Sequence, residues 1–164
     1  MKKITDFLRD EGISPELIQE VQEFSATHPV KEGLKGRIPV PHFYYYGKKA
    51  WEEALAALLC GKNLLLAGEK ATGKNVLAEN LATVFGHPAW DISFHVNMDA
   101  SSLIGTDTFR NGKVEFRPGP VYSCACSGGF GIFDEINMAR NEALAVLHSA
   151  LDFRRVIDLS LIHI

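Results

Sequence analysis

The feature that most constrains the fold is a glycine-bounded loop at residues 68–75, which reads Gly-Glu-Lys-Ala-Thr-Gly-Lys-Asn and follows the apolar run 63–67. The pattern predicts a strand that enters a tight loop, with a helix behind it. Gly68 and Gly73 permit backbone angles that other residues resist, so successive N–H groups can turn toward an anion. Lys74 adds a positive charge where the helix directs the positive end of its dipole. The loop is therefore predicted to cradle phosphate.

The last position of this loop departs from the usual pattern Gly-x-x-x-x-Gly-Lys-Ser/Thr. Asn75 stands where a hydroxyl normally reaches Mg²⁺. Its amide oxygen can also bind a metal, but its shape and reach differ from those of a hydroxyl. We therefore predict that Asn75→Thr tightens the binding of a Mg²⁺-nucleotide. A glycine turn that binds nothing is the alternative interpretation of the loop taken alone.

A second motif lies further along the chain, where an apolar strand predicted at 130–133 ends in Asp134 and Glu135. An aspartate at the end of a neighbouring strand can hold the Mg²⁺ of a bound nucleotide. A glutamate beside it can orient or deprotonate a water that attacks the γ-phosphate. A solvated strand end is the alternative interpretation of this pair taken alone. Paired with the phosphate loop, it predicts that nucleotide is hydrolysed.

Periodicity and turn residues place the remaining elements. Alternating strands and helices predict parallel pairing with crossovers, so the fold class is α/β with a parallel sheet flanked by helices. Both motifs then belong at the carboxyl ends of the strands. The predicted helices are 48–59, 75–85, a short turn at 99–105, 120–127 and 141–151; the predicted strands are 63–67, 90–96, 130–133 and one that begins at Arg154; a hairpin is predicted across 108–116, turning at Asn111 and Gly112.

Residues 1–40 are expected to form an N-terminal helical segment and a connector. Ser14 and Pro15 are typical of a helix start. Two interpretations of this segment stay open: a prefix packed on the main domain, or a docking element for another subunit. One face of the predicted helix carries Leu17, Ile18, Val21 and Phe24.

Residues 42–46 read His-Phe-Tyr-Tyr-Tyr, an aromatic run just before the first predicted helix of the main domain. One interpretation is an aromatic wall against an adenine base. The other, which we favour from the sequence, is a short strand or a core anchor.

Length and composition exclude several classes of protein. At 164 residues the chain can hold one domain with a core, and its net charge of −3 favours neither a nucleic acid nor an anionic membrane as partner. Its apolar runs are shorter than a membrane span, and its first residues lack a signal-peptide core. We therefore expect no membrane association, no specific nucleic acid and a cytoplasmic location.

With these motifs in order, the sequence resembles the AAA+ ATPases and, among them, the MoxR type. Residues 68–75 resemble the Walker A loop of that family, and residues 132–139, Ile-Phe-Asp-Glu-Ile-Asn-Met-Ala, resemble its Walker B strand. Residues 99–120 and 147–158 resemble the segments between and after these motifs. The resemblance covers about residues 41–158.

This resemblance implies a three-layer P-loop NTPase core over 41–158 that is incomplete at its C-terminus, since the sensor, arginine finger and lid of the family have no room in the chain. It implies a homo-oligomeric ring, commonly of six subunits, that remodels a protein client with ATP and Mg²⁺, often beside a partner carrying a von Willebrand factor A-type domain. An arginine finger supplied in trans can be worth about 10³–10⁵ in rate. The chain alone is therefore expected to hydrolyse ATP weakly.

The family's functional residues carry over by position. Asp134 matches the magnesium-associated aspartate and Glu135 the catalytic glutamate. Lys74 is the phosphate lysine and is counted as catalytic, while Asn75 takes the second metal position. The hairpin matches an insertion that typically faces the central pore of the ring. The nucleotide is expected to contact Gly68, Glu69, Lys70, Ala71, Thr72, Gly73, Lys74 and Asn75.

Residues 159–164 end the resemblance abruptly. They are also what an in-frame translation of a transposon-end sequencing adapter encodes. We expect them to be a non-native tail.

Three functions compete on this evidence. The first is the ring-forming ATPase that remodels a client. The second is a P-loop small-molecule kinase, which usually needs a mobile lid that the sequence does not display. The third is a non-catalytic nucleotide-binding scaffold, favoured by Asn75. A GTPase is disfavoured because the chain has no Asn-Lys-x-Asp run.

Overall fold

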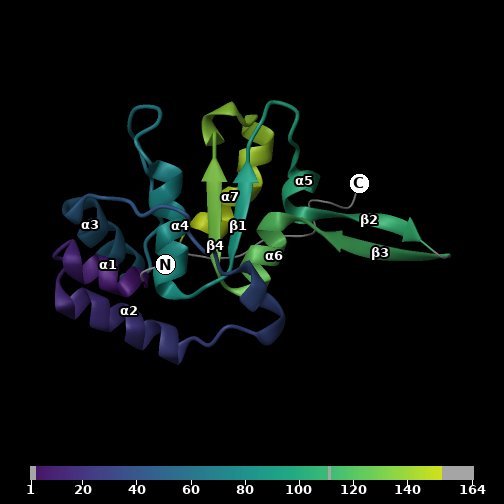
Figure 1. Ribbon diagram of the computed structural model, residues 1–164. Coiled ribbons are helices and arrows are strands. Elements are labelled where there is room, and N and C mark those ends of the chain that lie inside the picture. The colour runs from purple at the N-terminus through teal and green to yellow at the C-terminus, as the bar shows by residue number, and fades with distance from the viewer. Residues whose placement is uncertain (1–2, 111, 153–164) are drawn as a thin grey trace. The chain divides into compact units, whose positions relative to one another are not determined.

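The computed structural model describes residues 3–110 and 112–152 (Figure 1). The chain divides into two compact units, Met1–Ala89 and Trp90–Ile164, and each is described by itself.

Three predictions fall wholly or partly outside the described residues. They are the strand that begins at Arg154, the tail at 159–164 and the Asn111 half of the hairpin turn.

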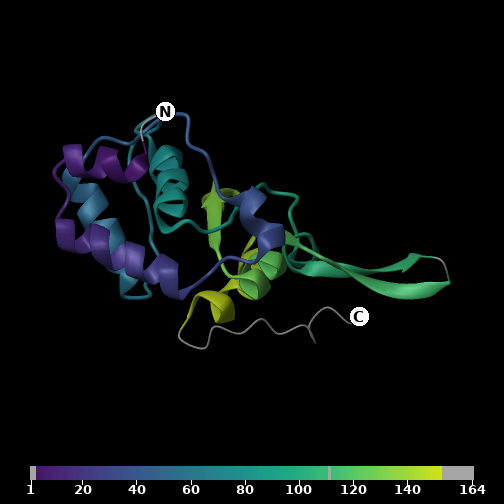
Figure 2. The same ribbon diagram turned by 60° about the horizontal axis from the view of Figure 1, so that its bottom comes forward.

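The first unit is helical in its described part (Figure 2). Helix α2 contacts both α3 and α4, and α1 contacts α2 and α4. The N-terminal helices therefore pack on α3 and α4 within this unit, and a role in docking another subunit stays a prediction. The elements are α1 (Ile4–Asp10), α2 (Pro15–Thr27), the 3₁₀ helix η1 (Glu32–Arg37), α3 (Lys48–Leu59) and α4 (Lys74–Phe85).

Local signals explain where these helices begin and which faces they bury. Ser14 Oγ accepts a hydrogen bond from the Leu17 amide at 3.4 Å, and Pro15 occupies the first turn of α2. Burying each large apolar side chain stabilises the unit by about 1.5–3 kcal/mol. The buried set includes Phe7, Leu8, Ile18, Val21, Trp51, Leu55, Leu77, Leu81 and Phe85.

The strand predicted at 63–67 is wrong: these residues form neither helix nor strand, and Leu65 is 85% exposed. The apolar run has the composition of a strand. A strand, however, exists only when a neighbouring strand pairs with its N–H and C=O groups. The described residues of the first unit include no strand that could pair with it before Ala89.

In the second unit, strand β1 (Ala89–Ser93) pairs with β4 (Phe130–Asp134), and the two run parallel as predicted (Figure 1). The sequence placed the first of these strands at 90–96. The predicted alternation of buried and exposed residues holds through Phe94, which is buried. Val96 is 49% exposed because the strand ends at Ser93.

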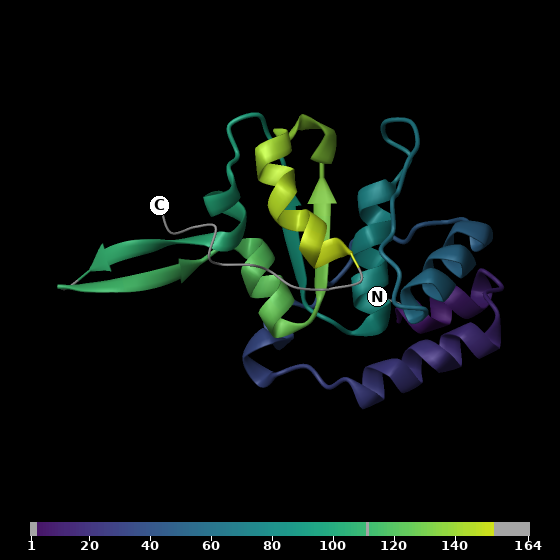
Figure 3. The same ribbon diagram turned by 180° about the vertical axis from the view of Figure 1, so that it is seen from behind.

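Helices cover this small sheet and form one core with it. Helix α7 (Asn141–Leu151) crosses a face of the strands (Figure 3), and α5 (Ala100–Ile104) and α6 (Pro120–Ser127) pack into the same cluster. The α/β class with parallel strands flanked by helices is therefore confirmed. The buried cluster consists of Ile92, Phe94, Leu103, Ile104, Val121, Ala143 and Leu147.

The predicted hairpin is formed by β2 (Gly105–Arg110) and β3 (Lys113–Pro118), which pair antiparallel over a longer span than the sequence indicated. Gly105 has φ 129°, and a Cβ there would lie 2.4 Å from the Arg117 carbonyl oxygen, so only glycine fits at the base of the hairpin.

Candidate functional site

The loop before α4 is a tight turn with unusual backbone angles. Ala71 has φ 61° and Gly73 has φ 81°, so both lie in the left-handed region. The Thr72 hydroxyl donates to the Glu69 carbonyl at 2.9 Å and closes the turn. Gly73 was predicted to take such angles. Ala71 was not, because alanine carries no sequence signal for this conformation.

Lys74 folds back over the loop that precedes it. Its Nζ donates to the Gly68 carbonyl at 2.9 Å and to the Glu69 carbonyl at 2.5 Å, and lies 3.5 Å from Thr72 Oγ1. An ammonium has three hydrogens to donate. Two of its contacts are hydrogen bonds to carbonyl oxygens, whereas the contact to the hydroxyl is long, and a phosphate oxygen can replace it.

Helix α4 begins directly behind this loop. Gly73 is its N-cap residue, and no side chain caps the helix. The first amides of an α-helix have no acceptor within the helix, and they lie at the positive end of its dipole. The loop, the uncapped helix start and the Lys74 ammonium therefore present the donor set that a phosphate group requires.

The acidic pair ends strand β4 in the second unit. The Asp134 carbonyl accepts the Phe94 amide of the neighbouring chain segment at 2.9 Å, which fixes the end of the strand. Asp134 Oδ1 accepts the backbone amide of Glu135 at 2.9 Å. Glu135 itself has φ 52° and is exposed, and it is the N-cap residue of the short 3₁₀ helix η2 (Ile136–Met138). Its carboxylate is thus open to water.

The structure brings the predicted residues together in two groups. The residues of 68–75 form one continuous loop and helix start in the first unit. Asp134 and Glu135 are adjacent at a strand end in the second unit. That both groups bind the same nucleotide stays a prediction.

Sequence reasoning missed Asn80, a fully buried polar residue of α4. Its Oδ1 accepts the Tyr45 amide at 3.0 Å, and its Nδ2 donates to the Phe43 carbonyl at 2.9 Å. The signal was available, because Asn80 falls on the apolar face of the helix between Leu77 and Leu81. Asn80 ties the aromatic run to the helix that follows the phosphate loop.

The aromatic run itself is anchored to the helical prefix. The Tyr44 ring stacks on Phe7 at a centroid distance of 4.7 Å, and the Tyr46 ring meets Phe7 edge-on at 5.1 Å. A short strand at 42–46 is wrong, since these residues form no regular element. The anchoring interpretation fits these contacts, and the adenine wall stays a prediction.

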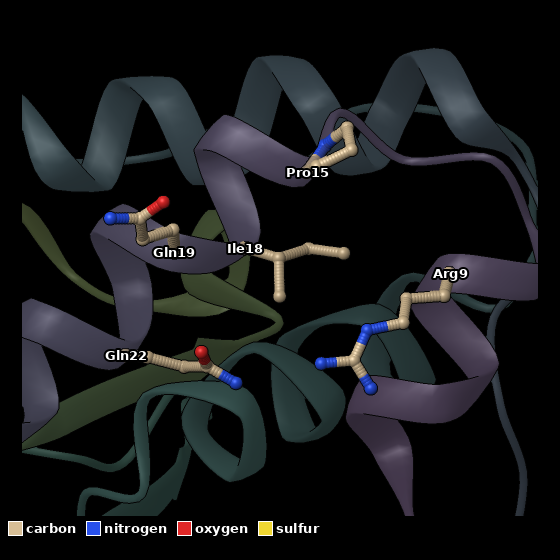
Figure 4. Close-up of a pocket in the computed structure, with 5 residues that line it drawn as sticks. All are labelled: Arg9, Pro15, Ile18, Gln19 and Gln22. Atoms are coloured by element: carbon tan, nitrogen blue, oxygen red, sulfur yellow. The ribbon is translucent and has the colours of Figure 1, made fainter.

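A groove on the prefix contains none of the predicted site residues (Figure 4). The Arg9 guanidinium, which lies at one side of it, pairs with the Asp6 carboxylate at 3.0 Å. The lining offers one cation and two amides but no acid, base or nucleophile. It consists of Arg9, Pro15, Ile18, Gln19 and Gln22.

In the part of the chain that the structure describes, no helix has the length and apolar character needed to cross a membrane.

Comparison with known proteins gives both a family and relatives. Residues 63–160 match the AAA domain (dynein-related subfamily). The chain is 34% identical over 146 residues to the uncharacterized protein YojN of Bacillus subtilis. This match covers 87% of this chain and 48% of that protein.

Two staphylococcal proteins show similar relations. The uncharacterized protein SSP1341 of Staphylococcus saprophyticus is 38% identical over 110 residues, 64% of this chain and 42% of that protein. The uncharacterized protein SAB1265c of Staphylococcus aureus is 35% identical over 121 residues, 71% of this chain and 46% of that protein. The chain thus spans about half the length of the curated relatives it matches.

Proposed function

Because this chain belongs to the AAA domain family, in its dynein-related subfamily, we propose that it binds and hydrolyses ATP as a MoxR-like module that remodels or activates a client protein within an oligomeric ring. The family makes it an AAA+ nucleotide-binding ATPase module. The observation that supports the finer proposal is the loop at 68–73, which is closed by Lys74 and leads into the uncapped start of α4. This is a phosphate site built from the chain's own backbone.

Lys74 and the α4 amides bind the phosphates in this proposal. Lys74 keeps its hydrogen bonds to the loop carbonyls and directs its remaining hydrogen to a phosphate oxygen. Each of the two proposed metal residues offers the kind of hard oxygen ligand that Mg²⁺ prefers: Asp134 a carboxylate at the end of β4, and Asn75 an amide in the first turn of α4. When bound, the ion neutralises charge on the phosphates. Glu135 orients a water and accepts its proton, which its exposed position at the end of β4 allows.

The ring and its client are proposed from the similarity to MoxR-type proteins, as are a partner with a von Willebrand factor A-type domain and the cytoplasmic location. The β2–β3 hairpin suits contact with a client, because Phe109 and Val114 lie opposite each other and are 77% and 67% exposed. Mass photometry with and without ATP tests for the ring. A species that stays monomeric at every nucleotide and protein concentration would count against it.

Two substitutions test the proposed chemistry in the 164-residue chain. Lys74→Ala is expected to remove most binding of a fluorescent ATP analogue, and Glu135→Gln is expected to spare binding. Single-turnover release of labelled phosphate, with protein in excess, is expected to fall by about 10²–10⁴ in Glu135→Gln, the usual contribution of a general base.

Each alternative has its own outcome in these assays. ATP binding without phosphate release, even in the full-length protein, supports the non-catalytic scaffold, and label found on a small acceptor supports a kinase. Unchanged phosphate release in Glu135→Gln contradicts the role given to that residue.

Asn75→Thr tests the metal position separately. We expect it to tighten Mg²⁺-nucleotide binding in titration calorimetry, because threonine restores a hydroxyl at this place in the loop. Equal or weaker binding would reject that role for Asn75.

A further inference from the structure

Phe7 of α1 fixes the aromatic run that precedes α3. Its ring is buried, stacks on Tyr44 at 4.7 Å and meets the edge of Tyr46 at 5.1 Å. Tyr44 and Tyr46 flank Tyr45 in the chain, so these two contacts restrain the backbone on both sides of Tyr45. A further tether lies beside them, where Glu11 Oε1 accepts the Gly47 amide at 2.9 Å.

Tyr45 points its ring at the phosphate loop. A Cβ built on Gly73 would lie 3.2 Å from Tyr45 Cδ2 and 3.4 Å from Cε2, so this edge of the ring packs on Gly73. The opposite edge packs on Gly47, where a Cβ would lie 3.0 Å from Cε1. The ring is therefore wedged between the glycines that begin α3 and α4.

The backbone of Tyr45 is held by two fully buried side chains. Its amide donates to Asn80 Oδ1 at 3.0 Å, and its carbonyl accepts the Trp51 indole N–H at 2.8 Å. These bonds come from α4 and α3, the helices whose starts the ring separates. The position of the ring is thus set by the packing of the whole helical unit.

We propose that helix α1 is a positioning element for the phosphate loop, and that Phe7 and Tyr45 transmit its position to Gly73. Gly73 needs its left-handed conformation, φ 81° and ψ 19°, to turn the chain into α4 with its amides directed at the anion. The Tyr45 ring limits the other conformations open to this glycine. The inference rests on the proposed nucleotide site and gives Phe7 and Tyr45 a positioning role there, acting through Gly73.

Such coupling acts in both directions. If docking of α1 favours the binding conformation of the loop, then bound nucleotide favours docking of α1 by the same factor. A partner that pulls α1 away from Tyr44 and Tyr46 would lower the nucleotide affinity.

The test compares Phe7→Leu with the matched control Phe24→Leu in the 164-residue chain. Phe24 is also an aromatic residue of the prefix with ring contacts, but its partners are His28, Phe85 and His87, at the far end of α4 from Gly73. One readout is the amide resonance of Gly73 in the nucleotide-free chain. The other is the dissociation constant of a fluorescent ATP analogue.

We expect Phe7→Leu to shift the Gly73 resonance and to weaken binding about three- to tenfold, the factor that one aromatic pair can supply. Phe24→Leu is expected to change the dissociation constant less than twofold and to leave the Gly73 resonance within the spread of the wild-type spectra. Tyr45→Leu provides a second route, because Tyr45 is half-buried and its replacement is expected to fold. It should reproduce the weakening, while Tyr45→Phe, which keeps the ring, should restore wild-type affinity.

Two results would overturn the proposal. One is an unchanged Gly73 resonance and affinity in both Phe7→Leu and Tyr45→Leu. The other is equal weakening by Phe7→Leu and Phe24→Leu, since that would reflect a general loss of stability. Failure of the wild-type chain to bind the ATP analogue would contradict the proposed function instead, and the Gly73 resonance would still decide the coupling.

Discussion

Asn80→Ala tests how firmly the aromatic run is held to α4. The Asn80 side chain is fully buried, accepts the Tyr45 amide at 3.0 Å and donates to the Phe43 carbonyl at 2.9 Å. Alanine removes both hydrogen bonds and leaves a backbone N–H and a backbone C=O facing a methyl group.

The expected cost follows from these two groups. A buried polar group that loses its partner costs about 1–3 kcal/mol. Phe43 is 74% exposed, so water can reach its carbonyl more easily and the cost at this group lies at the low end of that range. Alanine also has the better helix propensity and returns up to about 0.7 kcal/mol. The net loss in the free energy of unfolding is therefore about 2–3 kcal/mol.

Urea denaturation followed by tryptophan fluorescence measures this loss in the first unit. The chain has two tryptophans, Trp51 in the first unit and Trp90 in the second, so a Trp90→Phe background reports on Trp51 alone. Glu53→Ala, on the exposed side of α3, is the control and should stay within about 0.5 kcal/mol of the background. A loss below about 1 kcal/mol in Asn80→Ala would refute the claim that this amide holds the aromatic run in place.

Three further predictions concern Gly105, Asp99 and Cys124 of the second unit. Gly105→Ala should destabilise it by about 2–4 kcal/mol, because the new Cβ would lie 2.4 Å from the Arg117 carbonyl oxygen, and thermal melting measures the loss. Asp99 is the N-cap residue of α5, and hydrogen bonds from the hydroxyl and amide of Ser102 lower the pKa of its carboxyl group. The stability that the ionised cap adds is therefore fully present above pH 3.8, the ordinary pKa, and is lost as pH falls through the lowered pKa of the folded state. Asp99→Ala and wild type should therefore differ in urea midpoint at pH 7 and converge in strong acid. Burial raises the pKa of Cys124 to about 11, so iodoacetamide at pH 8 should label the two exposed cysteines first, and equal labelling of all three would contradict this.

The sequence alone determined the elements whose signals are local. The structure reproduces the helix predicted at 120–127 as α6 with the same bounds, with Pro120 in its first turn and Gly128 just past its end. The glycine-bounded turn before α4, the strand that ends at Asp134 and the hairpin were likewise predicted, the hairpin over a shorter span than it has. The hydrogen bonds of the helix, the turn and the hairpin join residues close together in the chain, so a short stretch of sequence carries the information. The end of β4 differs, because the amide of Phe94 fixes it from a distant segment.

Only the tertiary structure decided features that depend on distant residues. The run 63–67 reads as a strand but is not one, because pairing needs a neighbouring strand that no local pattern guarantees. The placement of Tyr45 against Gly73, and of Phe7 against the neighbouring tyrosines, joins segments far apart in the chain. Periodicity gives the face that a residue occupies, whereas close packing of specific side chains selects its partner.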